Sequence, residues 1–285
     1  MKADLFTLGA ILLWATLASL ATLLSDIPPF LLTGIGLLIG AMVSLPSLRN
    51  GMKPWKVPLK TLLIGVYGLF GYHFMLFLAL QTAPAVEANL VNYLWPLLIV
   101  LLSPLFTKSL KLNFRYVIAA ISGFAGAVLA ITYNSSDLAS SSIEIGYLFA
   151  MSAAVIWATY SLATTKVPSF PTPAIGLFAL VSGVLAIGAH FLFEPAASIS
   201  ASDWALLALL GAGPLGGAFY LWDAALKIGD PRRIGLLAFL TPLLSTVLLV
   251  LVSGKSLSWQ LLVATALILG GALLGPRTSG EAKAK

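Results

Sequence analysis

The side chains that could do chemistry in this chain are polar groups set inside long apolar stretches. His73 lies in one such stretch, and Asn89, Asn92 and Trp95 follow at intervals of three in the next. That interval places the latter three on one face of a helix. Polar side chains among apolar residues of a membrane are costly unless they bind a partner or line a wet cavity. They therefore indicate a site that hydrogen bonds to a small solute.

Aromatic residues accompany these polar groups at comparable positions in the apolar stretches: Trp14, Tyr72, Phe77, Tyr93, Trp157 and Tyr160. Tryptophan in a membrane protein usually lies at the interface, where its N–H is hydrated. Tryptophan far from both ends of an apolar stretch therefore needs a cavity or a buried partner. We expect the rings to line a central cavity with His73 as its single titratable group. Ordinary packing of the rings, and a buried histidine that already has a partner, are the alternatives.

The inventory of residues excludes several classes of site. The chain has no cysteine, so disulfides and thiolate metal sites are impossible. His-x-x-x-His pairs, Gly-x-Ser-x-Gly elbows and deep carboxylate pairs are absent from the sequence, so we expect no enzyme, no cofactor and no metal site. Deep lysine or arginine is also absent, which disfavours phosphorylated solutes. A neutral or zwitterionic solute with an apolar or aromatic side chain fits best.

One carboxylate, Asp223, lies inside the apolar stretch at 203–226, near its cytoplasmic end. Lys227 follows it by four residues, and such a spacing favours an ion pair along one helix face. We expect that pair, and we take the neighbouring Tyr220 and Trp222 as candidates for an inner gate.

The composition of the whole chain shows which elements must position these residues. Hydrophobic residues make up 59% of the 285 residues and charged residues 9%, with a mean hydropathy of +1.00. Soluble domains are usually about 25% charged, so we predict an all-α integral membrane protein. About 20 apolar residues span a bilayer as a helix. Ten such spans are predicted, at residues 4–24, 29–48, 58–81, 85–106, 114–133, 143–165, 172–192, 203–226, 231–252 and 258–276.

The basic residues predict the orientation of these spans. All but one of the 16 lysines and arginines fall in segments on one side of the ten-span arrangement, and Lys255 is the exception. Cytoplasmic segments carry the excess of basic residues, so both termini are expected in the cytoplasm. Because the basic residues are spread over short connections, no nucleic-acid partner is expected.

The two halves of the chain resemble each other. Four matches recur in the same order at offsets of 143, 146, 146 and 147 residues: Trp14 with Trp157, Ala79-Leu80 with Ala225-Leu226, Pro96 with Pro242, and Lys108-Ser109-Leu110 with Lys255-Ser256-Leu257. We therefore predict a five-helix repeat at residues 1–138 and a second at 139–285. Five is odd, so the second copy is inverted relative to the first, which is typical of alternating-access transporters.

Candidate hinges follow from the residues that break helices. Pro96 and Pro242 fall near the middle of their spans, where proline removes a backbone hydrogen bond and kinks the helix. Gly213 and Pro214 lie in a run of small residues in the span at 203–226. Small residues that recur every four positions predict close helix contacts; they are Gly36/Gly40, Ala119/Gly123/Ala127 and Ala266/Gly270.

The sequence resembles the EamA-type members of the drug/metabolite transporter superfamily, and within it the bacterial exporters of aromatic amino acids. Ten spans in two inverted repeats carry the resemblance, together with the segments Gly71–Phe74 and Asn92–Leu97. It implies a basket-shaped fold. In that fold, spans 1–4 and 6–9 surround a central cavity, and spans 5 and 10 support this arrangement from outside. His73, Trp95 and Trp157 are the cavity residues that the resemblance indicates.

The implied activity is alternating-access export of aromatic and other apolar amino acids across the bacterial inner membrane. The expected partners are therefore the amino acid substrate, possible drugs and the lipid bilayer, and the protein is expected to be a monomer. Efflux of aromatic cations such as methyl viologen is the alternative within transport. A passive channel is the alternative from another class.

Overall fold

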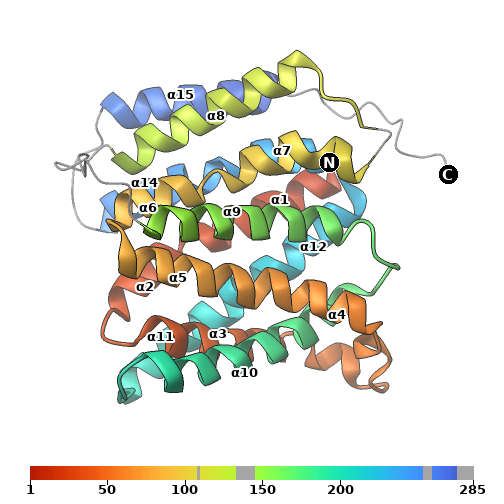
Figure 1. Cartoon of the computed structure of the whole chain (residues 1–285), viewed down its shortest axis with the longest axis vertical. Coiled ribbons are helices and arrows are strands. Elements are labelled where there is room, and N and C mark those ends of the chain that lie inside the picture. The colour runs from red at the N-terminus through yellow and green to blue at the C-terminus, as the bar shows by residue number, and fades with distance from the viewer. Residues whose placement is uncertain (108–109, 133–144, 253–258, 275–285) are drawn as a thin grey trace.

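The protein is helical throughout the part of the chain that its structure describes. The computed structural model describes residues 1–107, 110–132, 145–252 and 259–274, and within these ranges every regular element is a helix (Figure 1). Seven helical stretches there are long and apolar enough to cross a membrane: Lys2–Leu23, Leu59–Thr82, Ala85–Phe106, Phe114–Thr132, Ile145–Ala163, Thr172–Phe193 and Ala201–Ile228. The predicted all-α membrane class is confirmed. The expected division at 138/139 and the repeated residues 108–109 and 255–257 lie outside the described ranges.

Five of the predicted spans each contain one unbroken α-helix. They are α3 (Pro29–Met42), α8 (Phe114–Thr132), α9 (Ile145–Ala163), α10 (Ile175–Phe193) and α15 (Trp259–Leu274). Helices α3 and α15 are shorter than the other apolar stretches.

The other five predicted spans are interrupted. Their helices are α1 (Lys2–Ala15) and α2 (Leu17–Leu23), α4 (Leu59–Val66) and α5 (Tyr72–Thr82), α6 (Ala85–Asn92) and α7 (Trp95–Phe106), α11 (Ala201–Ala212) and α12 (Ala218–Ile228), and α13 (Pro231–Ala238) and α14 (Leu240–Val252). Short 3₁₀ helices at Leu45–Leu48, Lys53–Trp55 and Thr172–Ala174 lie in the connections.

The two prolines set two of these breaks at the same relative position. Helix α6 ends at Asn92 and helix α13 at Ala238, each four residues before a proline, Pro96 or Pro242. A proline ring clashes with the carbonyl group four residues earlier and supplies no N–H to it. Each helix therefore stops at that residue, and the proline falls in the first turns of the next helix.

Two further breaks are π-helical turns, at Tyr67–Gly71 and Gly213–Gly217. They start 146 residues apart, which is the offset of the sequence repeat. The second turn contains Gly213 and Pro214, where the sequence predicts a weak helix; the first was not predicted. The second turn packs closely on α3, since a Cβ at Gly216 would lie 2.8 Å from the Cα atom of Gly40. Gly40 therefore makes the close contact that its spacing predicts.

The helices form layers that mix the two halves of the chain (Figure 1). Helices α8 and α15 pack on each other at one side, and α3 and α10 pack on each other at the opposite side. Between them, α5 packs on α9, and α1 packs on α12. Helix α7 also packs on α9, and both α13 and α14 pack on α1. Each of these middle contacts joins a helix before residue 132 to one after residue 145.

Small residues bring α8 and α15 together, with one correction to the prediction. Ala119 and Gly123 of α8 are buried as expected. On α15 the predicted stripe is wrong: Ala266 is exposed, and a Cβ at Gly270 would meet nothing within 4 Å. Gly271 makes the contact instead, since its Cβ would lie 2.6 Å from a carbonyl oxygen of α8.

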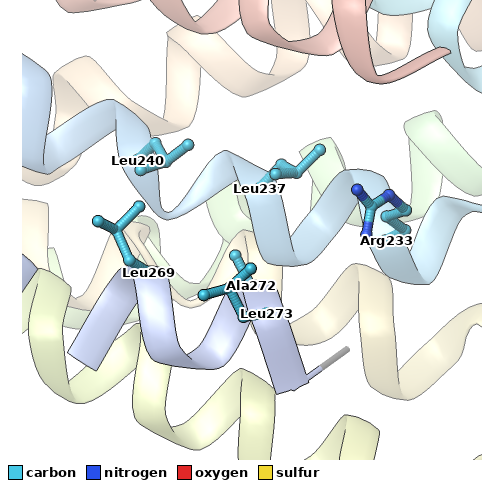
Figure 2. Close-up of a pocket in the computed structure, with 6 residues that line it drawn as sticks. All are labelled: Arg233, Leu237, Leu240, Leu269, Ala272 and Leu273. Atoms are coloured by element: carbon cyan, nitrogen blue, oxygen red, sulfur yellow. The ribbon is translucent and has the colours of Figure 1, made fainter. Parts of the chain in front are cut away.

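Helix α15 packs much less extensively on α13 and α14 than on α8. A groove of about 240 Å³ therefore lies between them (Figure 2).

Candidate functional site

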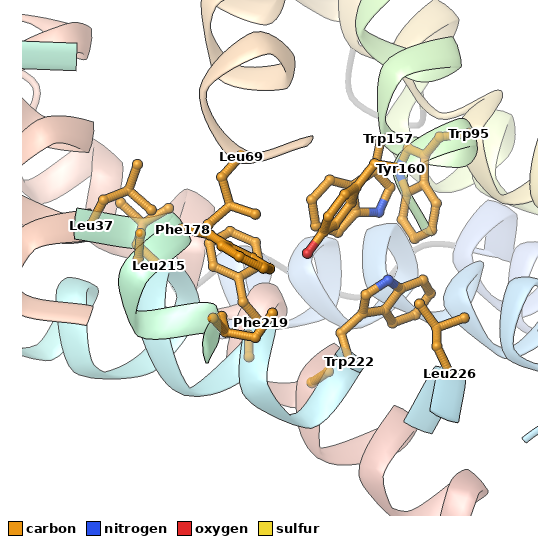
Figure 3. Packing of buried hydrophobic residues seen from close by; sticks show 14 of the residues in the cluster. Leu37, Leu69, Trp95, Trp157, Tyr160, Phe178, Leu215, Phe219, Trp222 and Leu226 are labelled. Atoms are coloured by element: carbon orange, nitrogen blue, oxygen red, sulfur yellow. The ribbon is translucent and has the colours of Figure 1, made fainter. Parts of the chain in front are cut away.

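Four tryptophans from four helices meet in the middle of the molecule. Trp14 (α1), Trp95 (α7), Trp157 (α9) and Trp222 (α12) form six ring pairs with centroids 5.2–6.3 Å apart, so every ring neighbours the other three. Figure 3 shows three of these rings directed toward one another. Trp95, Trp157 and Trp222 are at most 4% exposed, and Trp14 is partly buried. We call these four residues the tryptophan cluster.

Further rings extend the tryptophan cluster toward the first π-helical turn. Tyr72 and Tyr160 lie 5.3 and 5.2 Å from Trp157, and Phe219 lies 5.6 Å from it, by ring centroids. His73 then lies 6.2 Å from Phe219 and 6.1 Å from Phe77. His73 is 6% exposed, so it belongs to the buried aromatic region that its position predicts.

Two ring N–H groups bind carbonyl groups of the π-helical turns. The Trp14 Nε1–H donates to the Pro214 carbonyl oxygen at 3.1 Å, and His73 Nδ1 lies 2.6 Å from the Leu69 carbonyl oxygen. A carbonyl oxygen only accepts, so His73 Nδ1 carries the proton and Nε2 is the acceptor of the neutral ring. A π-helical turn alters the backbone pairing, and backbone groups in an apolar region need a partner within the protein. These two side chains, both from the first half of the chain, supply one partner to each π-helical turn.

A second polar contact lies beside the tryptophan cluster. The Asn92 Nδ2 group donates to the Tyr72 hydroxyl at 3.2 Å. Asn92 is 3% exposed, and its Oδ1 atom has no hydrogen-bond partner among the described residues. A buried acceptor without a partner is costly, so Asn92 Oδ1 is available to a donor from a solute.

The structure brings most of the predicted site residues together. His73, Tyr72, Phe77, Asn92, Trp14, Trp95, Trp157 and Tyr160 all belong to the connected set described above. Asn89 and Tyr93 are partly buried on the same span as Asn92. Within the described residues, neither side chain makes a ring contact or hydrogen bond with the tryptophan cluster.

Two members of the aromatic region were missed as site residues by the sequence reasoning. Trp222 was expected only at an inner gate, and Phe219 was not considered. Phe219 follows His73 by 146 residues, so the repeat offset itself would have found it. Tyr220, the other gate candidate, points elsewhere, and its hydroxyl donates to the Gly40 carbonyl oxygen at 3.1 Å.

Charged side chains gather on α12 and at the ends of α1 and α13. Lys227 Nζ lies 2.5 Å from Asp223 Oδ2, which confirms the predicted ion pair. The Thr172 hydroxyl also donates to Asp223 Oδ2, at 2.7 Å. Arg233 of α13 donates to Asp4 of α1 at 2.7 and 3.1 Å. The Lys227–Asp223 pair lies within α12, whereas the other two contacts join segments from different spans.

In this conformation the rings of the tryptophan cluster contact one another, so an open cavity between them stays a prediction. Within the described residues, no group of three or more His, Cys, Asp or Glu side chains could hold a metal ion. The arrangement offers ring faces, one buried amide acceptor and the His73 Nε2 atom. Such a set can bind an apolar side chain and a polar end without any cofactor.

Comparison with known proteins agrees with this picture. The sequence profile described as the EamA-like transporter family matches residues 1–132 and again residues 144–275. The chain is 41% identical to the aromatic amino acid exporter YddG of Ancylobacter novellus over 279 residues, which are 95% of this chain and 96% of that protein. It is 28% identical to the aromatic amino acid exporter YddG of Salmonella typhimurium, over 96% of each chain. A solved crystal structure of a 40% identical protein covers 96% of this chain and 97% of its own, with a TM-score of 0.89.

Proposed function

This chain belongs to the EamA-like transporter family, and from that premise we propose that it exports aromatic and other apolar amino acids by alternating access. Membership makes it a multi-pass membrane transport protein and not an enzyme. The relatives named above are aromatic amino acid exporters. The tryptophan cluster with the unpaired Asn92 Oδ1 beside it is the observation that carries the proposal.

The proposed architecture is a basket of ten spans in two inverted five-helix repeats, residues 1–138 and 139–285. Three observations support it: the two π-helical turns 146 residues apart, the two helices that end four residues before a proline, and the reciprocal packing of α5 on α9 and α1 on α12. The basic connections favour cytoplasmic termini in the bacterial inner membrane. In this arrangement α8 and α15 brace the basket from outside.

The proposed binding mode divides the substrate between apolar and polar contacts. The rings of Trp95, Trp157 and Phe219 take the aromatic or apolar side chain, because stacked and edge-to-face ring contacts are favourable beyond the area that they bury. Asn92 Oδ1 and His73 Nε2 accept hydrogen bonds from the ammonium group. Pairing a buried acceptor that is otherwise unsatisfied favours solutes that carry this donor.

The proposed conformational change uses the breaks in the spans. Pro96 and Pro242 separate helix segments in one pair of spans, and Gly213 and Pro214 lie in a π-helical turn of another. Hinges of this type are a few residues at the ends of elements that absorb backbone rotation. Rotation there separates the tryptophan rings and opens the site to one side of the membrane at a time.

The test is counterflow into proteoliposomes that contain the purified protein and are preloaded with unlabelled phenylalanine. We expect saturable uptake of labelled phenylalanine and competition by methionine and threonine. Trp157→Ala and His73→Ala should lower uptake when uptake is normalised to the amount of folded protein in the proteoliposomes. Absence of saturable uptake for every amino acid would contradict the proposal, and resistance of cells to methyl viologen without amino acid flux would favour cation efflux.

Asn92→Ala tests the polar half of the site. We expect a KM for phenylalanine raised by at least about tenfold, because a hydrogen bond to a charged group contributes ~1.5–3 kcal/mol and ~1.4 kcal/mol corresponds to a factor of ten. Inhibition by 3-phenylpropionate, which has no ammonium group, should change little. If the substitution weakens the binding of phenylalanine and of 3-phenylpropionate equally, Asn92 acts only through packing.

A further inference from the structure

A groove that the proposed transport site does not use lies on the side of the molecule (Figure 2). Leu237 and Leu240 line it on one wall, and Leu269, Ala272 and Leu273 line it on the other. Leu269 and Leu273 are 44% and 74% exposed, so the groove opens on the surface that faces lipid. Its volume is about 240 Å³.

Arg233 is the only charged residue among the six that line the groove, and it lies at one end. From Arg233 to Leu240 the chain advances seven residues, about 10 Å at 1.5 Å per residue of helix. The groove is therefore short and apolar, and it ends at a guanidinium group. This combination fits a lipid whose anionic headgroup binds the guanidinium group while the adjoining part of an acyl chain lies in the groove.

The guanidinium group keeps donors that its ion pair does not use. Nε and Nη2 of Arg233 donate to the two oxygens of Asp4, and among the described residues its Nη1 group has no recorded hydrogen bond. Arginine has five N–H donors arranged to bind planar or tetrahedral anions. The neighbouring Arg232 is held by Asp230 and by the Lys111 carbonyl oxygen, which leaves Arg233 as the cation at the groove.

The positive charge of Arg233 distinguishes between the possible occupants of the groove. The chain after Leu274 carries Arg277, Lys283 and Lys285 against a single acidic side chain, Glu281, so its side chains match the Arg233 guanidinium group less well than an anionic ligand does. Basic pockets between membrane helices at the cytoplasmic surface favour anionic phospholipid headgroups. We propose that the groove binds one anionic phospholipid, with the phosphate on Arg233 and an acyl chain between α14 and α15.

The experiment counts lipids that stay bound to the purified full-length protein in native mass spectrometry after equilibration with phosphatidylglycerol or phosphatidylcholine. The wild-type protein should retain one phosphatidylglycerol and lose phosphatidylcholine. Arg233→Gln should reduce phosphatidylglycerol retention by about fivefold, the effect of one basic residue at an anionic membrane surface. Asp4→Asn breaks the same ion pair but frees Arg233, so it should retain phosphatidylglycerol at least as well as the wild type.

A matched pair of substitutions on α15 tests the apolar wall. Ala272→Phe fills the groove and should reduce retention, whereas Ala266→Phe, which lies exposed on the same helix outside the groove, should not. Equal loss in Arg233→Gln and Asp4→Asn would show that only the ion pair matters and would overturn the proposal. Equal retention of the two lipids, or release by inorganic phosphate alone, would also overturn it.

Discussion

The His73 ring joins the backbone of the first π-helical turn to the aromatic region. Its Nδ1–H group holds the Leu69 carbonyl oxygen at 2.6 Å, while its Nε2 atom is the acceptor of the neutral ring. The two ring nitrogens therefore have separate tasks, one structural and one in the proposed binding of substrate. Substitutions that keep one nitrogen and remove the other separate these tasks.

His73→Asn places an amide donor where Nδ1 lies and supplies nothing in place of Nε2. We expect its thermal stability to stay close to the wild type, because the Leu69 carbonyl group keeps a donor. His73→Ala should unfold more easily by ~1–3 kcal/mol, since that carbonyl group loses its partner. Both variants should transport phenylalanine slowly in the counterflow assay; wild-type transport by His73→Asn would remove Nε2 from the site.

For single residues, the sequence predicted which aromatic side chains lie in the buried region better than it predicted the contacts that each of them makes. A tryptophan or histidine far from both ends of an apolar stretch signals a buried site, and Trp14, Trp157 and His73 lie in one. The residue type of Phe219 gave no such signal, since an isolated phenylalanine fits any apolar surface; only its offset of 146 residues from His73 marks it. The partners of Trp14 and His73 could not be predicted either, because both are carbonyl groups that π-helical turns redirect.

Among the elements, the two proline breaks define the segments on which the tryptophan cluster depends. Trp95 lies at the start of α7, directly after the break before Pro96, and α13 and α14 pack against the helix that carries Trp14. A continuous helix through either break would therefore move a cluster residue or its neighbour. This dependence makes both prolines suitable tests of the proposed hinges.

Pro96→Ala and Pro242→Ala should lower the maximal rate of counterflow and leave KM nearly unchanged. Each alanine allows one further backbone hydrogen bond in a straight helix, worth ~1 kcal/mol, which slows a hinge step by about fivefold. Thermal stability should rise or stay the same. A changed KM at an unchanged maximal rate would place the prolines in binding instead of motion.

The close approach of the second π-helical turn to α3 gives a stability prediction. A Cβ at Gly216 would lie 2.8 Å from the Gly40 Cα atom, whereas a Cβ at Gly188 in α10 would meet nothing within 4 Å. Gly216→Ala should lower stability by ~1–3 kcal/mol through overpacking. Gly188→Ala should raise it by ~0.5–1 kcal/mol because alanine favours helix. Melting temperatures of the two variants in one detergent check this, and equal values would contradict it.

The sequence predicted the seven stretches that the structure shows to be long and apolar enough to cross a membrane. It also predicted the neighbourhood of most breaks, but not their local backbone geometry. Hydropathy locates a span because most of its residues must be apolar, and proline marks a break because its ring clashes with the carbonyl group four residues earlier. The π-helical turn at Tyr67–Gly71 has no proline, and only its offset from the second turn marks it. On α15, spacing suggested Ala266 and Gly270, but Gly271 makes the close contact with α8, since spacing alone cannot say which face of a helix meets a neighbour.

Over the whole molecule, the helices of the two halves interleave instead of forming separate bodies. Helices α1 and α12 lie against each other, as do α5 and α9, so neither half buries its own aromatic residues alone. The tryptophan cluster takes two rings from before residue 132 and two from after residue 145. Sequence repeats predicted that two halves exist; their interleaving follows from contacts that no single sequence displays.

The absence of cysteine from the chain allows a direct test of membrane orientation. Asp26 and Lys56 are both exposed, in connections that the ten-span arrangement places on opposite sides. In whole cells, Asp26→Cys should react with an impermeant maleimide, and Lys56→Cys should react only after the membrane is opened, because basic connections stay in the cytoplasm. The reverse pattern would invert the topology, and reaction of both in intact cells would contradict the span count.

Four of the seven indoles of this protein lie within 6.3 Å of one another in the tryptophan cluster. Their ultraviolet emission therefore comes largely from one place, where the rings sit close enough to exchange excitation. A molecule that enters between them changes both their spacing and their polarity. Binding of a solute at the site can therefore be followed by the shift that it causes in the intrinsic tryptophan fluorescence. No attached dye is needed.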